Sequence, residues 1–272
     1  MPAKTVMVMS DLHCGHVVGL TPPSRHATLS KLATKSQKTL EKTREKLWEL
    51  FHKEVKARKT PDILIVNGDA IDGDGGRSGG SELLTPDPLE QADMAAECIK
   101  FVKAPKVYMT FGTPYHVGQA CDHERVVQNL VQDSKHNEEC HLKSHLYLDV
   151  NGCMFDCKHK TGGSGIPHGR HTAVAKEKLW NILWSATGVA PESDVIIRSH
   201  VHYAAYCGGP NHLAMTTPAL QGLGSKYGTR QCSGIVDWGF VWFEVEENGE
   251  YTWEIVTPLQ ANAAQKVEVM RA

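Results

Sequence analysis

The chain has 272 residues, and 29 Lys and Arg against 31 Asp and Glu give a formal net charge of −2, which excludes nucleic-acid binding through a generally basic surface. Hydrophobic residues at 41% and charged residues at 22% exclude intrinsic disorder, collagen and coiled-coil arrays. The 15 histidines outnumber the Phe, Tyr or Trp residues taken singly, and histidine is the commonest metal ligand. Their distribution along the chain therefore bears directly on function.

The sequence also predicts a compartment. No apolar run has the length of a secretory signal or of a transmembrane helix. The eight cysteines are scattered without C-x-x-C pairs, which is typical of reduced thiols rather than of a disulfide framework. We expect a cytoplasmic protein that makes no contact with a membrane.

The first half of the chain alternates strands with helices. Apolar runs predict buried strands over 5–10 and 63–66, separated by a helix over 29–59 that Pro61 ends. Five glycines in the eight residues 73–80 predict a mobile loop. A helix over 89–102, a strand over 106–111 and a polar helix over 122–133 follow.

The second half contains hairpins. Strands over 146–150 and 153–158 flank the turn dipeptide Asn151-Gly152, and strands over 240–245 and 251–256 flank a second turn. Between them lie an amphipathic helix over 172–184, in which Trp180 and Trp184 are predicted core residues, and a buried strand over 194–198. Strand–helix alternation followed by hairpins predicts a mixed α/β sandwich. No linker divides the chain, so we expect one domain over 1–272.

Five predicted strand ends carry side chains that bind metal ions. They supply Asp11 with His13, Asp69, His116, His159, and His200 with His202. Side chains at i and i+2 of an extended strand share a face, so the two paired sets can each reach one ion. Without His116 there are six candidate ligands, more than the four of a tetrahedral zinc, which predicts two divalent ions. Carboxylate and imidazole ligands without a thiolate fit Mn, Fe, Zn, Co or Ni, and we favour manganese.

In their order, these motifs resemble those of the calcineurin-like metallophosphoesterases. The resemblance covers residues 11–202 through Asp11-x-His13, Gly68-Asp69, Gly112 with His116, His159 and His200-x-His202. It implies a four-layer αββα sandwich and the hydrolysis of phosphomonoesters or phosphodiesters at a dinuclear metal centre. It further implies that Asp11, His13 and His202 hold one ion. His159 and His200 would hold the other, and Asp69 would bridge both.

One motif departs from the family pattern. The family has Gly-Asn-His, whereas Thr113-Pro114-Tyr115 separates Gly112 from His116 and supplies no Asn. The place of the Asn oxygen is then taken by Thr113, which we favour, by Tyr115 or by water. In a rival interpretation Asp122-His123-Glu124 is the displaced motif, with Asp122 in place of the Asn. We rank it lower because that stretch is predicted to be helical.

The predicted activity is metal-dependent hydrolysis of phosphate esters, with phosphodiesters favoured and either a small molecule or a nucleic acid as substrate. Asp69 and His116 are the predicted catalytic residues, His116 protonating or orienting the leaving oxygen. The glycine-rich stretch after His159 offers Arg170, His168 and His171 as substrate-binding groups. A second glycine-rich stretch carries Lys226, Tyr227 and Arg230, for which a solvated loop is the favoured interpretation. The alternative function is a binding or scaffold module on the same fold, with a weak or absent second ion.

Overall fold

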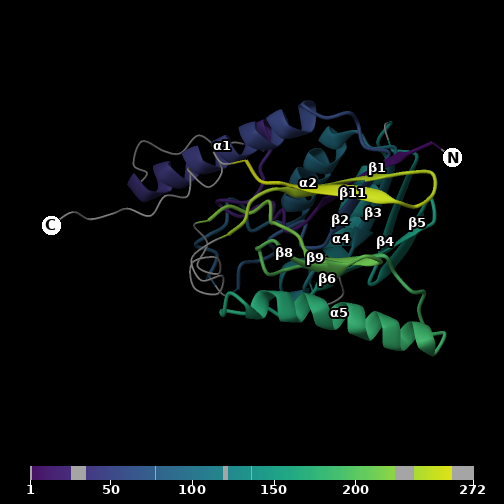
Figure 1. Ribbon diagram of the computed structural model, residues 1–272. Coiled ribbons are helices and arrows are strands. Elements are labelled where there is room, and N and C mark those ends of the chain that lie inside the picture. Colours follow the sequence, from purple (N-terminus) through teal and green to yellow (C-terminus); the bar gives the residue numbers. More distant parts are fainter. Residues whose placement is uncertain are drawn as a thin grey trace.

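The computed structural model describes residues 2–25, 35–76, 78–118, 122–135, 137–223 and 236–258. Its centre is two β-sheets packed face to face, with helices on both outer faces (Figure 1). None of the helices within these ranges is long and apolar enough to cross a membrane. The predicted positions Lys226, Tyr227 and Arg230 and the side chain of Asp122 lie outside what the structure describes.

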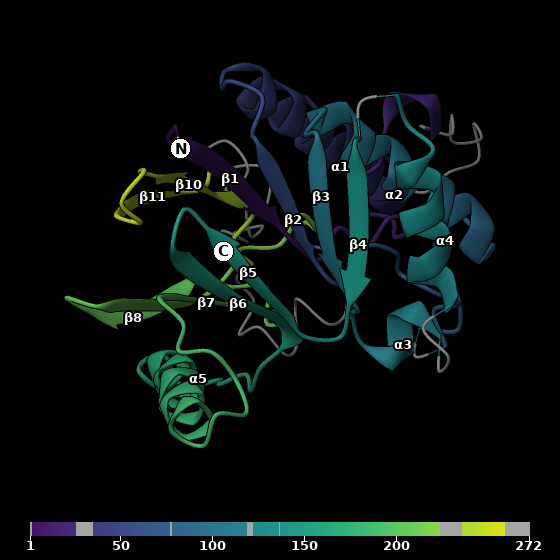
Figure 2. The same cartoon turned by 90° about the vertical axis from the view of Figure 1, so that its right-hand side faces the viewer.

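The first sheet has six strands in the order β11-β10-β1-β2-β3-β4. Their bounds are β1 (Lys4–Met9), β2 (Ile63–Asn67), β3 (Lys106–Thr110), β4 (Glu139–Lys143), β10 (Phe240–Val245) and β11 (Tyr251–Val256). Strands β1 to β4 are parallel, and β10 and β11 add an antiparallel hairpin beside β1. Figure 2 shows the parallel strands side by side.

The second sheet has five strands in the order β5-β6-β7-β9-β8. Their bounds are β5 (Leu146–Val150), β6 (Cys153–Lys160), β7 (Val195–Ser199), β8 (Ala205–Gly209) and β9 (His212–Thr216). Strands β6, β7 and β9 are parallel, and the two edge strands are antiparallel to their neighbours. Both sheets are therefore mixed, as the strand–helix–hairpin pattern predicts.

Helices α1 (Lys35–Lys56), α2 (Pro88–Val102) and α4 (Asp122–Gln132) cover the first sheet, and α5 (Gly169–Ala186) covers the second (Figure 1). A short helix, α3 (Pro114–Val117), follows β3. Side chains alternate along β1, so Met7 and Met9 pack under the helices while Val6 and Val8 face the second sheet. In that inter-sheet core the rings of Phe155 and Phe243 meet edge to face at 5.2 Å. The predicted four-layer αββα sandwich is confirmed.

Three strands were not predicted, namely β4, β8 and β9. Strand β4 is short, lies at a sheet edge and buries only alternate residues, Cys140 and Leu142, between polar ones. Strands β8 and β9 have five residues each and form a hairpin at the edge of the second sheet, and β8 ends in two glycines. Strands β4 and β8 carry a weak strand signal because few of their residues are buried. Strand β9 buries four of its five residues, but His212, Ala214 and Thr216 break up its apolar run.

The core prediction for Trp180 and Trp184 is wrong. Their side chains are 51% and 38% exposed, and the two rings stack on each other at 6.0 Å on the outer surface of α5. The helix instead turns Val174, Lys178 and Asn181 toward the sheet. Helical spacing predicts that a helix has an apolar face, but hydrogen bonds to the polar inner face decide which way this helix lies.

Candidate metal centre

Loops at the carboxyl ends of the strands bring the predicted ligands together. Asp11 follows β1 and Asp69 follows β2, while His116 lies in α3 just after β3. From the second sheet, His159 lies near the end of β6, and His200 and His202 follow β7. Three ligand groups form there, each with ligand atoms within 4.8 Å of one another: Asp11, His13 and His202; His13, Asp69 and His116; and Asp69, His159 and His200.

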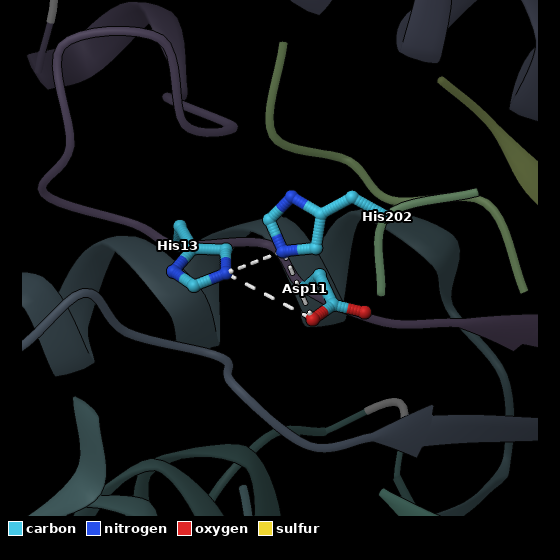
Figure 3. A group of neighbouring side chains, drawn as sticks. All are labelled: Asp11, His13 and His202. Carbon is cyan, nitrogen blue, oxygen red and sulfur yellow. Dashed lines mark hydrogen bonds and ion pairs between the residues drawn. The ribbon is translucent and has the colours of Figure 1, made fainter. Parts of the chain in front are cut away.

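The first group has the spacing of ligands around one ion. Asp11 Oδ1 lies 3.3 Å from His202 Nε2 and 3.8 Å from His13 Nε2, and the two imidazole nitrogens are 3.2 Å apart (Figure 3). At metal–ligand distances of about 2.1 Å, two ligands of one ion lie about 3.0–3.5 Å apart. Figure 3 shows the three ligand atoms turned toward a common point.

The group of Asp69, His159 and His200 lies beside the group of Asp11, His13 and His202. Asp69 Oδ2 is 2.9 Å from His159 Nε2 and 4.0 Å from His200 Nδ1. His159 Nε2 is also 3.9 Å from Asp11 Oδ1, so the two groups are adjacent. Asp69 occurs in two of the three groups, once with His159 and His200 and once with His13 and His116. Asp69 therefore lies within reach of His13 of the first group as well as of His159 and His200.

Buried carboxylates set the charge of the site. Burial by itself raises the pKa of Asp11 and Asp69, but the imidazoles of His202 and His159 hold both pKa values well below the usual range. Burial lowers the pKa of His13, yet the carboxylates of Asp11 and Asp72, which accept hydrogen bonds from the ring, raise it to about 10. In the same way, Asp69 outweighs burial and raises the pKa of His159 to about 9. The carboxylates thus attract positive charge into a buried site.

The residues present fit divalent cations. Asp11 Oδ1 and His159 Nε2 are buried and make no well-aligned hydrogen bond among the residues that the structure describes, although each lies at ion-pair distance from another predicted ligand. Buried polar atoms of this kind are rare in proteins and call for a ligand or an ion. Both atoms belong to the ligand groups, and a cation bound there would satisfy them.

The backbone is strained at these positions. Five of the predicted ligands have a positive φ: Asp11 (50°), His13 (45°), Asp69 (50°), His200 (76°) and His202 (54°). Residues other than glycine seldom adopt this conformation, and it concentrates at functional sites. Here it turns the chain sharply as it leaves the strands, which lets side chains from five segments converge.

Two glycines permit the close approach. A Cβ atom on Gly68 would lie 2.5 Å from His159 Cγ, and one on Gly112 would lie 2.1 Å from Asp69 Oδ1. The first glycine therefore admits the imidazole and the second admits the proposed bridging carboxylate. Both glycines were part of the sequence motifs, but their steric role becomes visible only in the structure.

Polar residues behind the ligands hold the imidazoles in place. Asp72 Oδ1 lies 3.0 Å from His13 Nδ1, and the Asp72 carbonyl accepts from His116 Nδ1 at 2.7 Å. The carbonyl oxygen of Asn67 lies 2.7 Å from His159 Nδ1. Such partners fix the tautomer and the orientation of a metal-binding histidine. Asp72 stands three residues after Asp69, and this spacing is the only sequence signal that pointed to it.

The loop after β3 contacts Asp69 directly. The amide of Thr113 donates to Asp69 Oδ1 at 2.7 Å, and its hydroxyl lies 3.2 Å from the same oxygen. Thr113 is thus next to the ligands, and its role as a ligand in place of the family Asn stays a prediction. His116 lies against His13, with ring centroids 4.5 Å apart. The structure therefore brings His116 into the ligand cluster.

Glu124 is a site residue that the sequence analysis placed only in the rival motif. Its carboxylate is fully buried and accepts from the amides of Gly112 (2.7 Å) and Ala70 (3.3 Å), one in each of the loops after β3 and β2. Burial and the charge of Asp69 raise the pKa of Glu124 to about 7. Glu124 fastens the two loops that carry Asp69 and Thr113.

The predicted substrate-binding residues lie outside the ligand cluster. The guanidinium of Arg170 stacks at 4.2 Å over the ring of Tyr203, the residue directly after His202. His171 Nδ1 lies 3.1 Å from the carbonyl oxygen of Tyr206 on β8. His168 immediately precedes α5 and is exposed. Of these three, Arg170 is the one that the structure connects to a metal-ligand segment.

Comparisons with known proteins find only distant similarity. No protein-family model matches the sequence, and no characterised protein sequence matches it. Among solved structures, a Vps29 variant from Entamoeba histolytica is similar at 12% identity and a TM-score of 0.43, covering 93% of this chain and 98% of the other. An archaeal phosphodiesterase reaches 15% identity and a TM-score of 0.42, covering 93% and 99%. A predicted phosphoesterase from Streptococcus pneumoniae has 12% identity and a TM-score of 0.36, and the match covers 93% of this chain and 98% of the other. Similarity this distant carries no functional argument, so function has to rest on the site.

Proposed function

We propose that this protein is a metal-dependent phosphoesterase of the calcineurin-like type, with two divalent cations and a preference for phosphodiesters. One observation carries the proposal: two adjacent groups of ligand atoms, Asp11 with His13 and His202 and Asp69 with His159 and His200, lie at one site, and Asp69 is also grouped with His13. Asp11, His13 and His202 would hold one cation, and His159 and His200 the other. Two bound cations supply charge neutralisation for a phosphate and a water of lowered pKa.

His116 is the residue we assign to the leaving oxygen. Its Nδ1 lies 2.7 Å from the carbonyl oxygen of Asp72, which fixes the ring and leaves Nε2 for the substrate. An imidazole held in this way can donate a hydrogen bond or a proton as the ester bond breaks. Asp72 also contacts His13, so one residue orients both a proposed ligand and the proposed acid.

Arg170 is the residue we assign to a phosphate oxygen at the edge of the site. Its Nε is buried and has no hydrogen-bond partner within the described ranges. Stacking on Tyr203 fixes the plane of the guanidinium, and a planar fork suits a phosphate. His168 and His171 stay predicted contacts with weaker support, because His171 already faces a carbonyl of β8.

The proposal includes a substrate range and a setting. The net charge of −2 favours a small phosphodiester over a long nucleic acid, since capture of a polyanion depends on basic surface. Manganese is our proposed native metal because the ligands are carboxylates and imidazoles. Within the described ranges six cysteines are free thiols, which supports the proposed setting in a reducing cytoplasm.

The test combines metal content with turnover. We expect dialysed wild-type protein to retain two ions per chain by mass spectrometry and to hydrolyse bis(p-nitrophenyl) phosphate with added Mn²⁺. Asp69→Asn should lose this activity, whereas Asp93→Asn on the surface of α2, where the side chain is 51% exposed, should retain it. Unchanged turnover in folded Asp69→Asn would refute the assignment. One ion or none, without turnover, would favour the binding module.

A further inference from the structure

Helix α5 carries a continuous apolar surface on its outer side. In both views it forms the outermost layer over the second sheet (Figures 1 and 2). Five large apolar side chains between 179 and 184 are from 38% to 57% exposed on this helix: Leu179, Trp180, Ile182, Leu183 and Trp184. We call these five residues the α5 apolar face. Apolar patches of this kind on a soluble protein mark interaction surfaces.

Polar contacts on the inner side hold the helix in this orientation. The buried Lys178 ammonium donates to the Ser193 carbonyl at 2.8 Å. The Asn181 side chain donates to the Ser193 hydroxyl at 3.1 Å and accepts from the Ser193 amide at 3.0 Å. Rotating the helix to bury its tryptophans would break these bonds and leave a buried amide unpaired. The hydrogen bonds to Ser193 therefore keep the α5 apolar face exposed.

The size of the face fits the centre of a dimer interface. Its five side chains present about 500 Å² of apolar surface, on a scale of ~150–250 Å² for a whole aromatic side chain. Specific dimers bury about 800 Å² on each partner, with an apolar centre inside a more polar rim. Neighbouring exposed residues of the same helix, among them Thr172 and Lys176, can supply the rim.

The spacing along the helix is self-complementary. Exposed residues recur at alternating intervals of three and four positions through Thr172, Ala175, Leu179, Ile182 and Ala186. A mean interval of 3.5 residues is typical of the row of side chains, or seam, along which two helices pack together. An antiparallel second copy, related by a twofold axis between 179 and 182, brings Leu179 against Ile182 and Ala175 against Ala186. Large side chains then meet at the centre, and small ones let the ends approach.

We propose that this protein forms a twofold-symmetric homodimer through α5, packed antiparallel against α5 of a second copy. This inference does not depend on the proposed phosphoesterase activity. A twofold interface needs one patch that complements itself, and the seam provides it. Among the exposed residues from 172 to 186, Lys176 is the only charged one, so like charges do not oppose each other across the seam.

The same charge pattern disfavours a membrane as the occupant. A helix that lies on a lipid surface carries Lys and Arg along its polar face. Here the polar face of α5 contacts the sheet, and Lys178 is bonded to Ser193. Two copies of the chain can cover each other without any basic residue.

Sedimentation equilibrium of the full-length protein tests the proposal. We expect wild-type protein to have twice the 30.0 kDa mass of the chain. Leu179→Glu and Ile182→Lys should each raise the dissociation constant about 30-fold or more, as central interface residues do. Leu89→Glu is the matched control, because Leu89 is 58% exposed on α2, away from α5, and should leave the dimer intact. The circular dichroism spectrum should be unchanged in all three variants, which shows that each of them folds.

The double variant Leu179→Glu/Ile182→Lys tests the antiparallel geometry. It places opposite charges against each other across the twofold axis, so the dimer should be recovered relative to either single variant. A wild-type monomer, or a dimer unaffected by the single variants, would overturn the proposal. Monomeric wild-type protein that sediments with phosphatidylserine vesicles would identify a lipid surface instead. A double variant no tighter than the singles would overturn the antiparallel pairing.

Discussion

Replacing Asp72 by Asn isolates the charge behind a proposed metal ligand. Asp72 Oδ1 lies 3.0 Å from His13 Nδ1, and their side chains are only 8% and 3% exposed. Asparagine has the same shape and keeps an oxygen for this hydrogen bond. The substitution therefore removes the negative charge and leaves the contact in place.

The expected loss follows from that burial. Removing the partner of a metal-binding histidine weakens metal binding by about 10–100-fold, which is about 1.4–2.7 kcal/mol. Water does not screen a pair this deeply buried, so we expect the upper end of that range. The same Asp72 oxygen lies 3.6 Å from His116 Nδ1, so kcat at saturating metal should also fall.

Manganese titration by calorimetry measures the first effect, and turnover of bis(p-nitrophenyl) phosphate at saturating Mn²⁺ measures the second. Asp74→Asn is the matched control, since Asp74 lies in the same loop but is exposed, and it accepts a hydrogen bond from the nearby Gly76 amide at 3.0 Å. The control should behave as wild type. If Asp72→Asn binds Mn²⁺ as tightly as wild type, Asp72 does not support a metal ligand.

Three further outcomes are expected. Gly112→Ala should reduce the rate of hydrolysis about 100-fold, because the added Cβ would lie 2.1 Å from Asp69 Oδ1 and push this carboxylate out of place. Gly162→Ala is the control and should leave the rate unchanged, because no atom lies within 4 Å of its added Cβ. Removing metal with EDTA should lower the melting temperature by about 5–10 °C, which is the stabilisation expected when the free metal concentration is about 100-fold above the Kd. Asp156→Asn should destabilise the fold by about 3 kcal/mol at pH 7, since the side chain is fully buried on Arg198 at 2.7 Å. Burial by itself raises the pKa of Asp156 in the folded protein, but His145 and Arg198 lower it further than burial raises it. The difference in unfolding free energy between wild type and Asp156→Asn should therefore be constant above the unfolded pKa of about 3.9. It should vanish as the pH falls through the folded pKa.

Three of the strands that lead to the site, β1, β2 and β7, were predictable because they are buried on both faces. Runs such as Ile63–Asn67 are apolar at every position except the last, and the motif residues follow directly. The i, i+2 rule then grouped Asp11 with His13, and the structure places them in one ligand group. The same rule is wrong for His200 and His202, which lie in different ligand groups because their backbone has left the extended conformation, with φ of 76° and 54°.

The remainder depends on contacts between distant segments. Glu124 reaches Gly112 and Ala70 only because α4 packs beside both loops, and no local pattern marks a glutamate in a polar helix as buried. The orientation of α5 depends on hydrogen bonds to Ser193 after the helix has ended. Periodicity reports that a helix has two faces, but the partner surface decides which face is covered.

The positive φ angles at five proposed ligands also limit how this site can change by mutation. Asn and Asp adopt the left-handed conformation more readily than other residues with a side chain, so Asp69→Asn alters the chemistry while the turn stays acceptable. Alanine at Asp11 or Asp69 removes a ligand and opposes the backbone in the same step. Alanine scanning would therefore overstate the contribution of each side chain. For the same reason, gradual loss of the metal centre through single substitutions is expected to pass through Asn, Asp or Gly at these positions.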